Sequence, residues 1–65
     1  MSKVSIEDQI KCVRRELALR RIVYKKRVDS GAMTQSTANR EIAAMEAVEA
    51  TLLELFEKQK TPNLF

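Results

Sequence analysis

The feature that most constrains the fold is the single glycine of this 65-residue chain, Gly31, which lies between two long runs of helical apolar spacing. The first run ends at Val28, and a glycine shortly after a helix is typical of a position with a positive φ angle. Thr34 follows where its side-chain oxygen can cap a second helix. Because the connection is short, we expect the two helices to lie antiparallel to each other.

The first run predicts a helix over residues 6–28. Ser5 is in position to cap its N-terminus, with the acidic residues Glu7 and Asp8 in the first turn. The helix has one main apolar stripe, and either Arg20 or Arg21 fills the missing step in it. On a helical wheel the apolar members of the stripe fall within about 60° of one another; they are Ile6, Ile10, Val13, Leu17, Tyr24 and Val28.

The second run predicts a helix over residues 35–60, which Pro62 stops. Glu49 lies beside its apolar stripe and needs a partner. In an antiparallel hairpin centred between residues 31 and 32, residue i lies roughly opposite residue 63 − i, so Arg14 lies almost opposite Glu49. The fold prediction is all-α: a single domain, residues 1–65, with a short extended tail at 61–65. The stripe consists of Ala38, Ile42, Met45, Leu52, Leu53 and Phe56.

Each predicted helix has a second, narrower apolar stripe beside its main one. Because the second helix runs antiparallel to the first, the order of its residues around the helical wheel is reversed, and the two narrower stripes fall on the same side of the hairpin as a second apolar surface. A chain of this size buries only about 60% of its unfolded surface, and its one cysteine forms no internal disulfide. We therefore expect two hairpins to pair through this surface into a dimeric four-helix bundle. The alternative is a monomer whose long basic side chains cover the stripe. The interface residues are Cys12, Leu19, Val23, Ala44, Val48 and Leu55.

Charge is distributed unevenly along the chain. The net charge is +3, from 12 basic and 9 acidic residues; residues 1–28 carry nine basic and three acidic side chains (+6), and residues 29–65 carry three and six (−3). The basic cluster near the connection favours contacts with phosphates or with an acidic partner. The alternative is that a basic helix simply attracts an acidic one. The cluster consists of Arg20, Arg21, Lys25, Lys26, Arg27 and Arg40.

The composition argues against catalysis. The chain has no histidine to activate a serine or to bind a metal, and no glycine-rich phosphate loop. Cys12 lies in mid-helix among apolar residues, where a thiol is typically inert. We expect no enzymatic activity, no cofactor and no metal. Charged residues throughout the first twenty positions argue against a signal peptide, and no run is long enough to span a bilayer, so we expect a cytoplasmic protein without membrane contact.

The C-terminal segment Thr61–Phe65 ends on two apolar residues, Leu64 and Phe65. An extended apolar end of this kind is typical of a short peptide that docks in a groove. It resembles the Leu-Phe-ending peptides that bind the bacterial sliding clamp, although Thr61 replaces their usual glutamine and Pro62 stands where leucine is common. The alternative is a tail that folds back onto its own bundle.

Three short patterns occur together in the chain: Arg20-Arg21-x-Val23-Tyr24, Gly31-x-Met33 and Glu41-Ile42-x-x-Met45. On the basis of these three patterns, residues 16–53 resemble a family of small helical-hairpin proteins encoded by tailed phages and prophages. Members often have proline where this chain has Lys25, which favours an unbroken first helix here. The family has no settled activity, so the resemblance implies no site residues. It implies a phage accessory protein that binds a host or phage protein, with nucleic-acid binding as the alternative.

Overall fold

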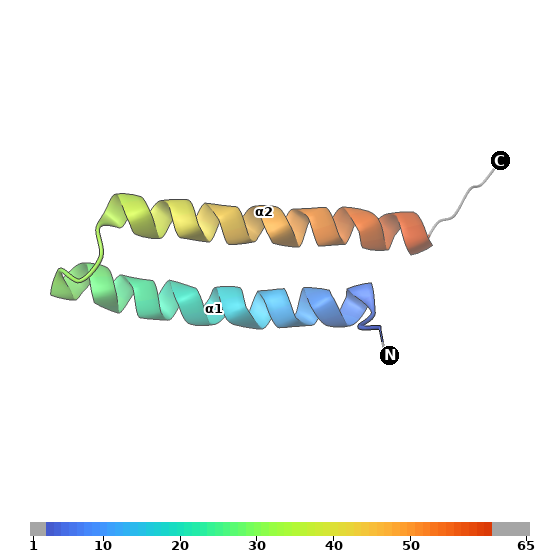
Figure 1. Cartoon of the computed structure of the whole chain (residues 1–65), viewed down its shortest axis with the longest axis horizontal. Coiled ribbons are helices and arrows are strands. Elements are labelled where there is room, and N and C mark those ends of the chain that lie inside the picture. The colour runs from blue at the N-terminus through green and yellow to red at the C-terminus, as the bar shows by residue number, and fades with distance from the viewer. Residues whose placement is uncertain (1–2, 61–65) are drawn as a thin grey trace.

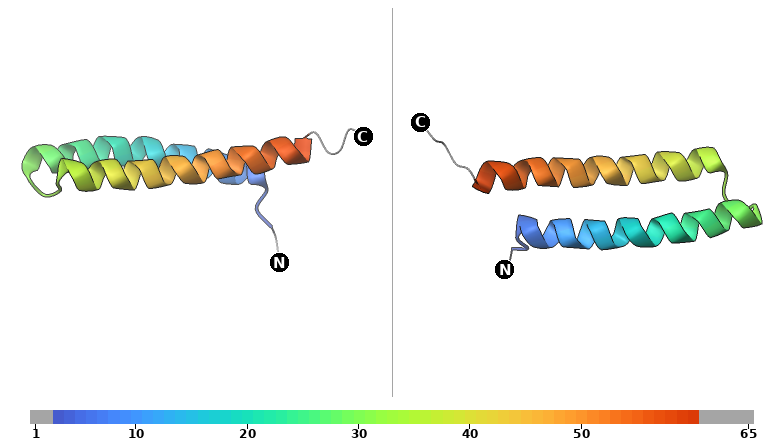
Figure 2. Two further views of the ribbon diagram at one scale, coloured as in Figure 1. Left: turned by 90° about the horizontal axis from the view of Figure 1, so that it is seen from above. Right: turned by 180° about the vertical axis from the view of Figure 1, so that it is seen from behind.

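The computed structural model describes residues 3–60, and in that range the chain forms two α-helices, α1 (Ile6–Ser30) and α2 (Gln35–Lys60). The helices run antiparallel and side by side, joined by a short connection at one end (Figure 1). Seen from above, α1 lies behind α2 and the two axes cross at a shallow angle, so the hairpin is a single layer of two helices (Figure 2). The all-α antiparallel hairpin is confirmed. The tail with Leu64 and Phe65 lies outside the described residues.

Both predicted N-caps are present. The Ser5 Oγ accepts a hydrogen bond from the Asp8 N–H at 3.0 Å, which satisfies a donor that the first turn of α1 leaves without a helical partner. The Thr34 Oγ1 accepts from the Thr37 N–H at 3.1 Å and does the same for α2. Because each cap involves residues only three positions apart, the sequence was sufficient to predict both helix starts.

Gly31 ends α1 in the left-handed conformation, with φ 85° and ψ 3°. Its N–H donates to the Val28 carbonyl at 3.1 Å, and the N–H of Ala32 donates to the Arg27 carbonyl at 2.8 Å. These bonds occupy carbonyls that the last turn of a helix leaves free. The helix continues to Ser30, two residues beyond the predicted end, because it stops only where the chain takes the positive φ angle.

A thin seam joins the helices. Ile10, Leu17 and Ala38 are the buried apolar residues of the described part of the chain, with 3–5% of their surface exposed. Arg20 is half-buried and Arg21 is exposed, so Arg20 fills the missing step of the α1 stripe. The seam alternates steps of three and four residues over most of its length, as in coiled coils. Its positions are Ile6, Ile10, Val13, Leu17, Arg20, Tyr24 and Val28 in α1, and Ala38, Ile42, Met45, Glu49, Leu52 and Phe56 in α2.

Candidate functional site

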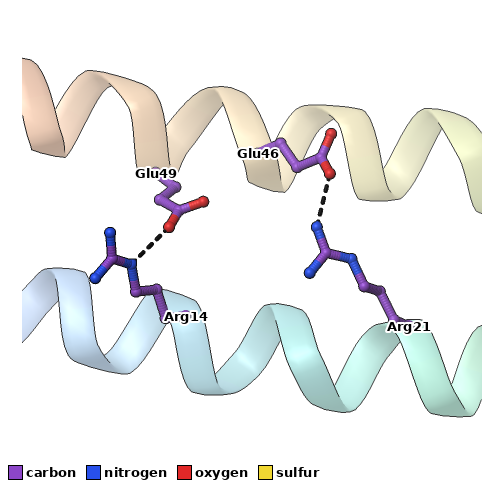
Figure 3. A network of polar contacts seen from close by, with 4 residues as sticks. All are labelled: Arg14, Arg21, Glu46 and Glu49. Atoms are coloured by element: carbon purple, nitrogen blue, oxygen red, sulfur yellow. Dashed lines mark hydrogen bonds and ion pairs between the residues drawn. The ribbon is translucent and has the colours of Figure 1, made fainter.

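Arg14 and Arg21 of α1 each form an ion pair with a glutamate of α2 (Figure 3). The Arg14 Nε lies 2.7 Å from the Glu49 Oε2, which confirms the predicted placement of these two residues opposite each other. The Arg21 Nη2 lies 2.7 Å from the Glu46 Oε2. The residue numbers sum to 63 in one pair and 67 in the other, so residue i of α1 lies level with residues 63 − i to 67 − i of α2. We call the side of the hairpin that carries these four residues the charged face.

These ion pairs mark the alignment of the helices but contribute little to the stability of the hairpin. The Arg14 side chain is 58% exposed, and Arg21 and Glu46 are each at least half exposed. Water and salt screen pairs of this kind, and each contributes typically less than about 1 kcal/mol. Glu49 is the exception among the four, since only 22% of its side chain is exposed. Arg14 therefore supplies the partner that this seam carboxylate requires.

The opposite side of the hairpin carries the six predicted interface residues, and we call it the apolar face. On a wheel of 100° per residue, Leu19 and Val23 lie about 120–160° from Leu17 in one sense, whereas Arg14 and Arg21 lie about 40–60° from it in the other. All six residues of the apolar face are exposed; they are Cys12, Leu19 (54%), Val23 (38%), Ala44, Val48 (46%) and Leu55 (43%).

The aligned levels bring the two halves of the apolar face together. Leu19 lies level with residues 44–48, hence between Ala44 and Val48. Cys12 lies level with residues 51–55 and so beside Leu55. On α1, Leu19 and Val23 share this side with Glu16, Arg20 and Arg27, so the apolar side chains stand among charged ones. Exposed apolar side chains that gather on one side of a small protein are typical of an interaction surface.

An ion pair borders the apolar face on α1. The Arg20 Nε lies 3.0 Å from the Glu16 Oε2, one helical turn away. This hydrogen bond is the main reason that the pKa of Arg20 lies above its ordinary value; the nearby charges of Tyr24, Glu16 and Glu41 act in the same direction, while desolvation opposes them. The guanidinium stays positive, and with Leu19, Val23 and Tyr24 it lines a shallow groove on α1. This pair was not predicted from the sequence, although acid–base spacing of four residues signals one.

The structure does not bring the predicted basic cluster onto one face. Successive residues of an α-helix are about 100° apart, so the run from Arg20 to Arg27 spreads around α1. Arg21 and Lys25 lie on the charged side, where Arg21 pairs with Glu46 and the Lys25 Nζ lies 3.7 Å from the Asp29 carboxylate. Arg20 is half-buried on the other side of α1, and the last three members of the cluster, Lys26, Arg27 and Arg40, are exposed.

A second groove lies between the helices near the connection, on the charged side. Half-buried or buried residues line it at Tyr24, Ala38 and Ile42, and exposed charged residues line it at Arg21 and Lys25. This groove was not predicted from the sequence. Part of its signal was present, because Tyr24 and Ile42 belong to the two apolar stripes and, on the wheel, Ile42 lies toward the side of α2 that carries Glu46.

Within residues 3–60, no three histidine, cysteine, aspartate or glutamate residues gather as a metal-binding group. Cys12 is exposed on the apolar face as a free thiol. In the same range, both helices are too polar to traverse a lipid bilayer.

Comparison of the chain with known protein families, with curated proteins and with solved structures finds no match. Inferences about function therefore rest on the two faces of the hairpin.

Proposed function

We propose that this protein is a small, non-enzymatic helical interaction module that forms a homodimer through its apolar face and engages a host or phage protein. The exposure of that face is the observation that carries the proposal. The resemblance over residues 16–53 supports the phage context, and with it action in the cytoplasm of a bacterial host.

The thin core of the hairpin supports self-association. A chain of this size buries only about 60% of its unfolded surface even when compact, and a single layer of two helices has one seam in which to bury apolar side chains. With three buried apolar residues in its described part, the hairpin gains more from a partner than from rearrangement within one layer.

Sedimentation equilibrium at micromolar concentration tests the proposal. We expect a dimer for the unmodified chain, and we expect Val23→Glu and Val48→Glu to give monomers that keep much of their helical circular dichroism. The matched control is Ala43→Glu, because Ala43 is exposed on α2 and lies about 140° from the buried Ala38 on the wheel. A monomeric unmodified chain, or equal effects of all three substitutions, would reject the proposal.

Nucleic-acid binding is the second candidate. It is favoured by the net charge of α1, which has eight basic and four acidic residues and so carries +4. Phosphate contacts from exposed residues such as Lys26, Arg27 and Arg40 would weaken steeply with salt. Fluorescence anisotropy with a labelled DNA duplex at 50 and 200 mM salt measures this. A loss of affinity that Lys26→Glu and Arg27→Glu reproduce at low salt would favour this function over protein binding.

A further inference from the structure

The apolar face fits a second copy of this chain in a definite orientation. Two identical layers that stack face to face through a two-fold axis have two parallel arrangements. If the axis runs along the helices, α1 of one copy lies across α2 of the other and both connections are at the same end. If the axis runs across the helices, α1 lies on α1, α2 lies on α2, and the connections are at opposite ends.

We propose that the apolar face is covered by a second copy in the first of these arrangements, with each α1 lying across the α2 of its partner. We call this the crossed arrangement and the other the like-on-like arrangement. The inference rests on the self-association in the proposed function and specifies its geometry. Three features of the hairpin carry it: the charges of the helices, the levels of the apolar residues and the residues at the edges of the face.

The helix charges favour the crossed arrangement. α1 carries +4, and α2, with three basic and five acidic residues, carries −2. Like-on-like stacking places one helix of charge +4 against another of the same charge. Crossed stacking instead places +4 against −2 in both halves of the interface, so that the facing helices have opposite net charges.

The levels of the apolar residues favour it too. In the crossed arrangement, residues at the same level meet, so Leu19 of one copy enters the gap between Ala44 and Val48 of the partner. Cys12 meets Leu55 in the same way. Side chains that enter gaps in the facing helix are the packing mode of helical bundles. By two-fold symmetry, each contact occurs twice.

The like-on-like arrangement disrupts this match. Its two-fold axis runs across the helices, so the connection end of one copy lies over the terminal end of the other and residues at the same level no longer meet. With the axis through residue 18, the middle of α1, Leu19 of one copy lies level with residue 17 of the other, between Glu16 and Leu19 of that copy. Leu55 then lies level with the region of Arg40. Each of these apolar side chains therefore has a charged neighbour, at a cost in desolvation.

The charged residues at the edges of the apolar face also favour the crossed arrangement. Arg20 borders the apolar face on α1, and the charge of Glu41 on α2 is near enough to influence it. Arg27 lines the same α1 groove and lies level with residues 36–40, next to Glu41. Crossed stacking therefore places a positive edge of each copy along the edge of its partner that carries Glu41.

A distance between spin labels at the connection tests the orientation. Ala32→Cys in a Cys12→Ala chain carries one nitroxide per copy, and Ala32 is exposed. Double electron–electron resonance should give about 25 Å or less in the crossed dimer, since helices in contact lie 8–10 Å apart. The like-on-like dimer separates the labels by more than about 37 Å, the length of a 25-residue helix.

A mixed sample provides the matched control. One chain carries the label at Ala32→Cys and the other at Glu7→Cys, at the far end of α1. Their heterodimer should show the long distance in the crossed arrangement and the short one in the like-on-like arrangement. A long distance between two labels at residue 32 in an intact dimer overturns the crossed orientation and leaves the proposed function standing. A monomeric chain, by contrast, overturns both.

The unmodified chain offers a second test, should replacement of Cys12 weaken the dimer. Salt screens the attraction between unlike helices, so the dissociation constant of the crossed dimer should rise roughly threefold or more from 50 to 500 mM sodium chloride. Salt would instead tighten the like-on-like dimer by screening repulsion. A dissociation constant that falls with salt therefore overturns the crossed arrangement.

Discussion

Replacing Gly31 by alanine tests the connection on which both faces depend. Gly31 has a φ angle of 85°, and a Cβ built at this position meets no atom within 4 Å. The substitution therefore causes no clash, and its whole cost is the poor tolerance of alanine for positive φ. That cost is about 1 kcal/mol of unfolding free energy. In a domain of this size it lowers the melting temperature by roughly 4–8 °C.

Thermal unfolding followed by circular dichroism measures this, at a fixed protein concentration because association shifts the midpoint. Gly31→Asn should cost less than Gly31→Ala, and Gly31→Val should cost more, since asparagine tolerates positive φ and β-branched residues do not. As a control, Ala43→Gly in the middle of α2 should destabilise by about 1 kcal/mol. If Gly31→Ala raised the melting temperature, the glycine would lie inside one continuous helix, and the hairpin would be rejected.

Three further predictions concern the cap, the seam and the charged face. Thr34→Ala removes the acceptor for the Thr37 N–H and should cost about 1 kcal/mol in urea unfolding; an unchanged midpoint would show that the cap is dispensable. Leu17→Ala should cost about 2–3 kcal/mol in the same assay, because Leu17 is only 3% exposed, and a loss below about 1 kcal/mol would mean that the seam is not the core. A double-mutant cycle with Arg14→Met and Glu49→Gln should give a coupling below about 1 kcal/mol that shrinks in 0.5 M salt, whereas a salt-insensitive coupling above about 2 kcal/mol would contradict the exposure of Arg14.

The sequence predicted the features that depend on neighbouring residues. The caps at Ser5 and Thr34 and the left-handed Gly31 each involve hydrogen bonds over three to five positions. The antiparallel alignment also followed, because a short connection leaves little freedom in how two helices pair. This is why the contact between Arg14 and Glu49 could be predicted across 35 positions.

Features that depend on the exact rotation of a helix were harder to predict. Arg20 and Arg21 fit the missing step of the stripe equally well by spacing, and only packing against α2 distinguishes them. The basic cluster is compact in the sequence but spreads around α1 in space. Exposure of the apolar face could be anticipated from the wheel. The molecule that covers that face is a separate matter, because one sequence describes only one side of an interface.

The brevity of the connection between Ser30 and Gln35 has a consequence for how the protein folds. Closing so small a loop costs little entropy, so each helix meets its own partner at an effective concentration in the millimolar range. At micromolar protein, pairing within a chain should therefore outpace exchange of helices between chains. We expect contacts next to the connection to form first and the seam to close from there toward the termini, since contacts between residues close in sequence favour fast folding. Hairpin formation should be a fast phase independent of protein concentration, with association as a slower bimolecular step after it.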